Sequence, residues 1–167
     1  MLTRPHIALL GRYNSWQNRS IYGAAATLDD AARKQDRGAH FRSIHGTLNH
    51  LLWGDQTWLS RFAGTAKPAA KSIAESPDTF DDWDDLAAAR TTFDQTIEHW
   101  SASVSEDWLG RDLSWFSGAA GRDVTKPAWF CVAHFFNHQT HHRGQVHAML
   151  TAAGAKPDDT DLFYLDL

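Results

Sequence analysis

The chain has 167 residues, 43% of them hydrophobic and 22% charged, which is an ordinary balance for a globular protein. Its net charge of −4 and the lack of a basic run exclude binding through phosphate contacts, so no nucleic acid is expected. The apolar stretches fall far short of the ~20 residues that span a bilayer, and the N-terminus does not resemble a secretory signal. Cys131 is the only cysteine, so an internal disulfide is impossible. We therefore expect one cytoplasmic domain over residues 1–167, with no membrane partner.

Three segments in the first two thirds of the chain have apolar residues at helical spacing. The first, residues 3–32, begins at Thr3, a good N-cap, and ends at the charged sequence KQDRG. The second is expected over residues 41–62 and the third over residues 79–100. Residues 63–80 contain glycine and proline and form a connection. About 15 extended residues reach ~50 Å, so this connection is long enough to cross a helix of ~33 Å.

A short hairpin and a long last helix complete the chain. Within residues 103–126, SEDWLG forms at most one turn, and LSWFSGAAGRDVTK alternates around a Gly-rich centre, which predicts a small β-hairpin. Pro127 then begins a helix that extends to Ala153, with Gly154 as its stop signal. Four long helices with little strand predict an all-α four-helix bundle, with a long crossover between the second and third helices.

Five of the ten histidines lie between residues 134 and 147. At about 100° per residue, His138 and His142 lie about 40° apart on one face of the last helix. Phe135 and Met149 share this face, so we expect the pair in the middle of the apolar stripe. Two buried imidazoles without a shared partner would be unfavourable. The spacing therefore favours a common metal over two core histidines that are satisfied by hydrogen bonds.

A third ligand must come from another helix, and the second helix offers His50 and His45. His50 lies one turn from both Gly46 and Gly54, and each glycine costs ~1 kcal/mol relative to alanine in a helix. Either tight helix packing or room for a metal and its ligand would explain them. We expect His50 at the edge of the apolar stripe, which suits an open site, and His45 farther round the helix.

The sequences of these two helices, HGTLNHLLWGDQTWL and NHQTHHRGQVHAML, resemble those of the DinB-type family of metal-binding four-helix bundles. The resemblance extends to Pro127 and to the closing PDDTDLFYLDL, so it covers nearly the whole chain. It implies a divalent metal bound by His50, His138 and His142, with zinc or nickel as the leading choices and iron or copper as the others. It also implies an up-down-down-up bundle and frequent homodimers.

Three neutral imidazoles leave coordination positions open, as in catalytic metal sites. By resemblance to characterised relatives, the leading hypothesis is a metal-dependent thiol S-transferase that uses a low-molecular-weight thiol and an electrophilic substrate. Two alternatives stay open, a metal-dependent hydrolase and a non-enzymatic metal-binding or stress-response module. A site that reaches solvent favours the enzymes, and a closed, fully ligated site favours the module.

Residues around the candidate ligands are assigned from helix register. Gln145, Asn49 and Asp55 are candidates to accept a hydrogen bond from a ligating imidazole. Arg143 is expected to face away from the site, in an exposed or inter-subunit ion pair.

Trp129 and Phe136 are expected on the face of the last helix opposite the histidines. Two large rings on that face need cover, since sizeable exposed apolar patches mark interfaces. Cover can come from the hairpin or the apolar tail. We favour a homodimer, most simply through a two-fold contact.

Overall fold

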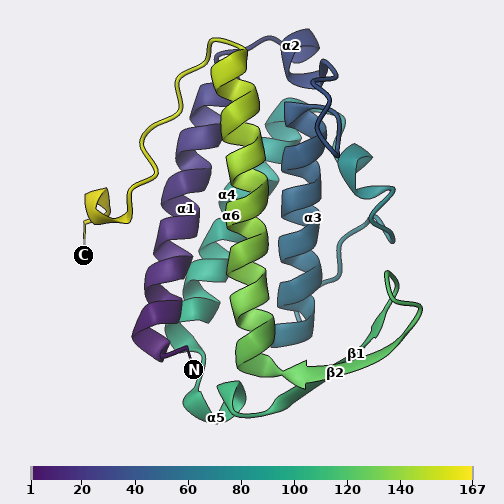
Figure 1. Ribbon diagram of the computed structural model, residues 1–167, viewed down its shortest axis with the longest axis vertical. Helices are drawn as coiled ribbons and strands as arrows, with labels where there is room; N and C mark the ends of the chain where they lie inside the picture. Colours follow the sequence, from purple (N-terminus) through teal and green to yellow (C-terminus); the bar gives the residue numbers. More distant parts are fainter. Residues whose placement is uncertain (1, 167) are drawn as a thin grey trace.

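The computed structural model describes residues 2–166 and is mostly helical. The four long helices in Figure 1 are α1 (Arg4–Ala26), α3 (Ile44–Ala63), α4 (Trp83–Ser103) and α6 (Ala128–Ala152). The shorter helical elements are α2 (Asp30–Lys34), η1 (Ser76–Asp78), α5 (Glu106–Leu109) and η2 (Leu162–Tyr164). Strands β1 (Asp112–Ser117) and β2 (Arg122–Pro127) form an antiparallel hairpin. A mostly helical fold with a hairpin before the last helix is thereby confirmed. Within residues 2–166, no helix is long and apolar enough to cross a membrane.

Side-chain caps determine where the helices begin. The hydroxyl of Ser43 accepts from the backbone N–H of Gly46, and the carboxylate of Asp82 accepts from two N–H groups in the first turn of α4. These caps place the starts of α3 and α4 a few residues later than the sequence predicts. The prediction of one continuous helix over residues 3–32 is wrong, because α1 ends at Ala26 and Asp29 caps the separate helix α2.

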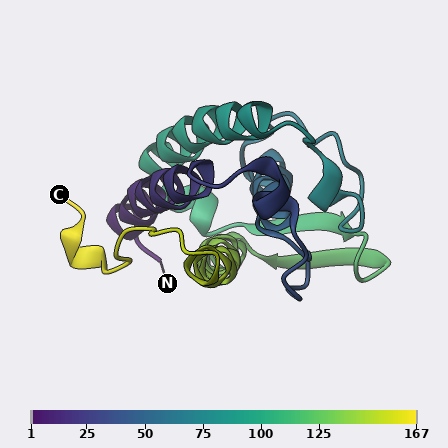
Figure 2. The same cartoon turned by 90° about the horizontal axis from the view of Figure 1, so that it is seen from above.

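The long helices run in two directions. In Figure 1, α1 and α6 run upward, whereas α3 and α4 run downward. Helix α1 packs against α4 and α6, and α3 packs against α6 and α4. The connection over residues 64–82 places η1 against α3. Figure 2 shows that the hairpin and the C-terminal segment leave the bundle on opposite sides.

Two separate apolar clusters form the core. The upper cluster lies at the end of the bundle where α3 and α4 begin, and it contains Leu48, Leu86 and Leu150. The lower cluster lies where these two helices end, and it contains Leu59 and Ile97. On every long helix, buried polar residues occupy the turns between these clusters. The members of this polar layer are Asn14, Asn18, Asp55, Arg90, Asp94, Gln139 and Arg143.

Arg90 lies at the centre of the polar layer. Its Nη1 donates to Oδ2 of Asp55 at 2.7 Å, and its Nη2 lies 2.8 Å from Oδ1 of Asp94. The amide of Gln139 donates to Oδ1 of Asp55 at 3.0 Å. Burial raises the pKa of both aspartates, and the adjacent guanidinium opposes this increase. These contacts join α3, α4 and α6 across the core.

Arg143 also belongs to this layer, so the expectation that it faces away is wrong. It is buried, and its guanidinium donates to Oδ1 of Asn14 on α1. Asn14 in turn donates to Oδ1 of Asp94 at 3.0 Å. The apolar periodicity of α6 does not reveal this position, because a charged residue enters a core only where other buried polar groups receive it.

The face of α6 that carries Phe136 was expected to be exposed, and the structure shows that Phe136 is buried. Phe136 is only 5% exposed and belongs to the lower apolar cluster, against which Trp129 packs as well. The chain's own core therefore covers Phe136. The C-terminal segment instead lies on the side of α1 (Figure 1). There the Tyr13 hydroxyl donates to the carbonyl of Thr160 at 2.7 Å. The homodimer stays a prediction, without the support of an uncovered Phe136.

Candidate metal site

Helices α3 and α6 bring together His50, His138 and His142. One ring nitrogen from each lies within 4.8 Å of the other two. The Nε2 atoms of His50 and His138 are 3.4 Å apart. Two nitrogens bound at 2.0–2.1 Å to one tetrahedral ion lie about 3.4 Å apart, so the spacing fits a shared ion. Among residues 2–166, no fourth histidine, cysteine or carboxylate joins this group.

Gly54 provides the space in which the His138 ring lies. A Cβ atom on Gly54 would lie 2.8 Å from Cε1 of His138, closer than such atoms approach. Gly46 has a different role, because a Cβ there would lie 2.6 Å from the carbonyl oxygen of Phe41. Both explanations that the sequence left open therefore apply, room for a candidate ligand at Gly54 and close backbone packing at Gly46.

Hydrogen bonds on the far side of two rings set their orientation. Nδ1 of His50 lies 2.8 Å from Oγ of Ser76, and that hydroxyl itself donates to the carbonyl of Ile73. Nδ1 of His142 lies 2.8 Å from Oε1 of Gln145. Both oxygens act as acceptors, so Nδ1 of each ring carries the proton. Nε2 of each ring is then left with a free lone pair, as metal binding requires.

The environment keeps these imidazoles neutral. Burial lowers the pKa of His50 and His138 to about 3, and the neighbouring His142 adds to this effect. Burial also lowers the pKa of His142, although the hydrogen bond to Gln145 opposes this decrease. Metal binding needs unprotonated imidazole, so at neutral pH the three side chains are in the form that binds a cation.

The exposure of His50 and His138 is the reverse of the expectation, whereas His142 is buried as expected. His50 is only 3% exposed, and the ring of Phe41 stacks on it at a centroid distance of 3.7 Å. His138 is half-buried at the edge of α6, whose buried face centres on Gln139 and Val146. Helix register placed His138 centrally because apolar residues alone defined the stripe, whereas polar residues occupy its centre. His138 is the partly exposed member of the three, so solvent reaches the cluster at this ring.

The predicted hydrogen-bond partners are confirmed only in part. Gln145 contacts His142 as expected. Asn49 instead bonds the backbone of Phe80, and Asp55 belongs to the polar layer. Ser76 was missed, because it lies in the connection between α3 and α4, where no periodic pattern indicates which side chains turn inward.

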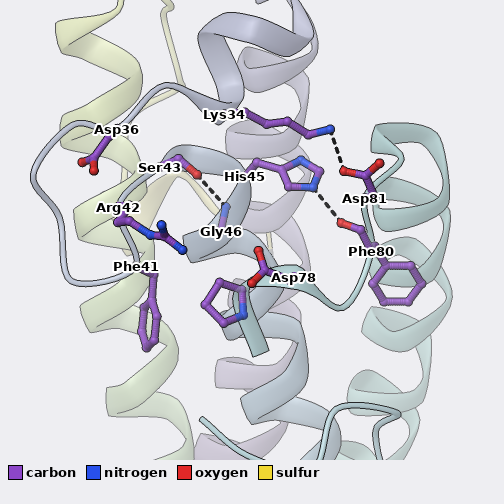
Figure 3. A pocket seen from close by; sticks show the side chains of 11 residues that line it. Lys34, Asp36, Phe41, Arg42, Ser43, His45, Gly46, Asp78, Phe80 and Asp81 are labelled. Carbon is purple, nitrogen blue, oxygen red and sulfur yellow. Dashed lines mark hydrogen bonds and ion pairs between the residues drawn. The ribbon is translucent and has the colours of Figure 1, made fainter. Parts of the chain in front are cut away.

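A cavity of about 350 Å³ lies beside the site and shares Phe41 with it (Figure 3). His45 lines this cavity, and its Nε2 lies 2.7 Å from the carbonyl of Phe80. That bond explains why His45 does not join the cluster. The Phe41 ring, stacked on His50, separates the cavity from the three imidazoles.

The fold and the cluster define a helical bundle that carries three convergent imidazoles on two of its long helices. The DinB family model matches residues 1–167, so the chain belongs to the DinB family. Protein DinB of Bacillus subtilis (strain 168) is 26% identical over 153 residues, which cover 91% of this chain and 88% of that protein. The crystal structure of a DinB-like protein from Bacillus cereus ATCC 10987 matches with a TM-score of 0.63 over 86% of this chain and 90% of the other. At 16% identity, this second likeness supports the fold alone.

Proposed function

We propose that the chain binds one divalent metal through His50, His138 and His142, and that it is a metal-dependent transferase acting with a small-molecule thiol. The observation that carries the proposal is the convergence of three ring nitrogens within 4.8 Å of one another. Zinc or nickel is the proposed ion, because both bind imidazole nitrogen well.

The number of protein ligands favours a reaction over a purely structural site. Structural zinc sites use four protein ligands, whereas catalytic sites keep one position for water or substrate. The cluster supplies three ligands, and one of them, His138, is half-buried. When bound, a divalent ion would lower the pKa of a thiol and favour the nucleophilic thiolate at neutral pH.

The chain's own groups have defined roles in this proposal. Ser76 and Gln145 hold the rings of His50 and His142 with Nε2 unprotonated. Phe41 covers His50 and limits access of water from that side. A thiol would therefore enter from the side of His138, with an electrophilic substrate beside it.

Cobalt-loaded protein tests the thiol directly. Protein without an affinity tag should bind about one ion per chain, and adding cysteine should produce an intense near-ultraviolet thiolate-to-cobalt band. Consumption of cysteine with 1-chloro-2,4-dinitrobenzene should then exceed that of the His138→Ala variant. Bound metal without a thiolate band would refute the thiol and leave the metal site standing. Ester hydrolysis by the same protein would instead favour the hydrolase.

A further inference from the structure

Two rows of side chains continue from the three-histidine cluster toward the hairpin. Their members follow one another at intervals of three or four residues, which places them on one face of each helix. The row on α3 is His50, Gly54, Trp58 and Arg61, and the row on α6 is His142, His138 and His134.

Contacts between the rows form a cluster of aromatic and basic side chains at the lower end. The rings of His138 and His134 are 5.8 Å apart, and those of His134 and Trp58 are 5.0 Å apart. Trp115 of β1 meets Trp58 edge-on at 5.3 Å. Arg61 lies 4.6 Å from the Trp58 ring and 5.4 Å from the Trp115 ring. We call Trp58, Arg61, Trp115 and His134 the Arg61 cluster.

Among residues 2–166, no carboxylate forms an ion pair with the Arg61 guanidinium. Within this part of the chain its guanidinium contacts the Trp58 and Trp115 rings and forms no hydrogen bond, and burial lowers its pKa. The buried Arg33, Arg90 and Arg143 all donate to oxygen atoms. Stacking on two indoles stabilises the charge of Arg61 but uses none of its five N–H donors. These donors are therefore available to a ligand.

A second cation lies on the same side of the molecule. Burial raises the pKa of the Cys131 thiol, and the charges of Arg61 and Lys126 both oppose that increase. Lys126 is exposed near the end of β2. The positive charges of Arg61 and Lys126 therefore both act at this end of α6, one turn from His134, where they attract an anion.

We infer that the Arg61 cluster is a subsite for the oxyanion, a carboxylate or a phosphate, of a small-molecule substrate whose other end reaches the three-histidine cluster. The link to the histidines rests on the proposed function, whereas the anion subsite rests on Arg61 itself. A guanidinium binds either oxyanion through two parallel N–H donors, and the indoles pack against the apolar part of the molecule. Arg61 follows His50 by 11 residues, about 16 Å along α3. A molecule that spans roughly this length would therefore join the two sites.

A purely structural role of Arg61 predicts a different result. If Arg61 only clamps the hairpin onto α3, its replacement lowers stability and no anion is preferred. The indole N–H resonances of Trp58 and Trp115 distinguish the two roles. Metal-free protein is titrated with benzoate, phenyl phosphate and the neutral benzamide, while helical content is followed by circular dichroism.

We expect saturable shifts of both indole resonances with benzoate or phenyl phosphate and not with benzamide; the tighter of the two identifies the oxyanion. Arg61→Gln should weaken this binding at least about tenfold, since a hydrogen bond to a charged group contributes that much. Arg61→Lys should retain part of the affinity, and Arg19→Gln at an exposed position of α1 should retain all of it.

Equal shifts with benzamide, or unchanged binding by a folded Arg61→Gln variant, would overturn the inference. The comparison of benzoate with benzamide uses the wild-type chain, so it holds even if a variant fails to fold. Anion binding by a protein that binds no metal would preserve the subsite and refute the proposed function. Metal binding without a preference for the oxyanions would preserve the metal site and refute the subsite.

Discussion

Gly54 of α3 lies directly against His138 of α6, and a single added Cβ would come within 2.8 Å of Cε1 in the imidazole. The helix interior disfavours glycine by ~1 kcal/mol relative to alanine. Here the missing side chain lets the His138 ring lie between the two helices and approach His50 to 3.4 Å between Nε2 atoms. A residue without a functional group therefore determines the geometry of the candidate metal site.

Replacing Gly54 with alanine should weaken metal binding by about 10–100-fold, the range seen when the groups that support a ligand are changed. The added methyl group displaces the His138 ring, so affinity falls while helical content is kept. Competition with a chromophoric chelator measures the affinity. Gly144→Ala is the matched control on α6, because nothing lies within 4 Å of its Cβ position. An affinity equal to that of the control would show that the ring tolerates the methyl group.

Removing one imidazole should abolish stoichiometric metal binding. In His138→Ala, two nitrogens remain, and the bound metal should fall from about one ion per chain to a small fraction. The half-buried position of His138 predicts little loss of helical content. Elemental analysis of untagged protein gives the stoichiometry. His99→Ala, at an exposed position of α4, should keep the full metal content. Retention of one ion by the His138 variant would show that this ring is not a ligand.

Ser76 should contribute to metal affinity without touching the metal. In Ser76→Ala, Nδ1 of His50 loses its acceptor at 2.8 Å, so the ring is no longer held in one tautomer and orientation. We expect affinity to fall by about tenfold. Ser60→Ala is the control, because its hydroxyl likewise donates to a carbonyl three residues back but contacts no imidazole. Isothermal titration of both variants should separate them. Equal metal affinities of the two variants would show that the Ser76 hydroxyl serves only its hydrogen bond to the carbonyl of Ile73.

The polar layer should be sensitive to loss of one charge. In Asp55→Ala, the buried guanidinium of Arg90 keeps only Asp94, and Gln139 loses its acceptor. Breaking a buried pair in this way costs about 3–5 kcal/mol of unfolding free energy. Urea denaturation gives the value. Asp30→Ala removes an exposed carboxylate that pairs with Lys34, and little change is expected. If Asp55→Ala lowers the unfolding free energy as little as Asp30→Ala, then water enters the polar layer and replaces the lost contacts.

Stability of the metal-free protein should fall as the pH is lowered. The pKa of His50 and His138 is about 3 in the folded chain, against about 6.5 when unfolded. Between these values the unfolded state binds protons that the folded state does not, so stability present at pH 7 is lost below about pH 6.5. From pH 7 to pH 5 the loss is at most about 2 kcal/mol per histidine, and less for the partly exposed His138.

Urea denaturation at the two pH values measures this dependence. The double variant with His50→Gln and His138→Gln should lose part of it, because glutamine does not titrate. His99→Gln, at an exposed position of α4, is the matched control. A double variant that is as pH-sensitive as the wild-type chain would assign the effect to other groups.

Local patterns in the sequence already indicate the four long helices and select the three histidines that converge. The i, i+4 spacing of His138 and His142 follows from helix geometry alone, so both rings share one face whatever surrounds them. His50, between two glycines, could likewise be selected as the third member from its own helix. Caps such as Ser43 and Asp82 are short-range as well, although the apolar periodicity set the predicted helix starts a few residues too early.

Tertiary structure alone decided what each face of a helix meets. Helix register predicts that Arg143 faces away, and it becomes a core residue because Asn14 on another helix receives it. Gln139 is buried in the same layer because Asp55 accepts from its amide. Ser76 reaches His50 from a connection without periodicity. The physical reason is common to these cases. Helix register depends on residues a few positions apart, whereas burial of a polar group depends on partners that only the packing of distant segments supplies.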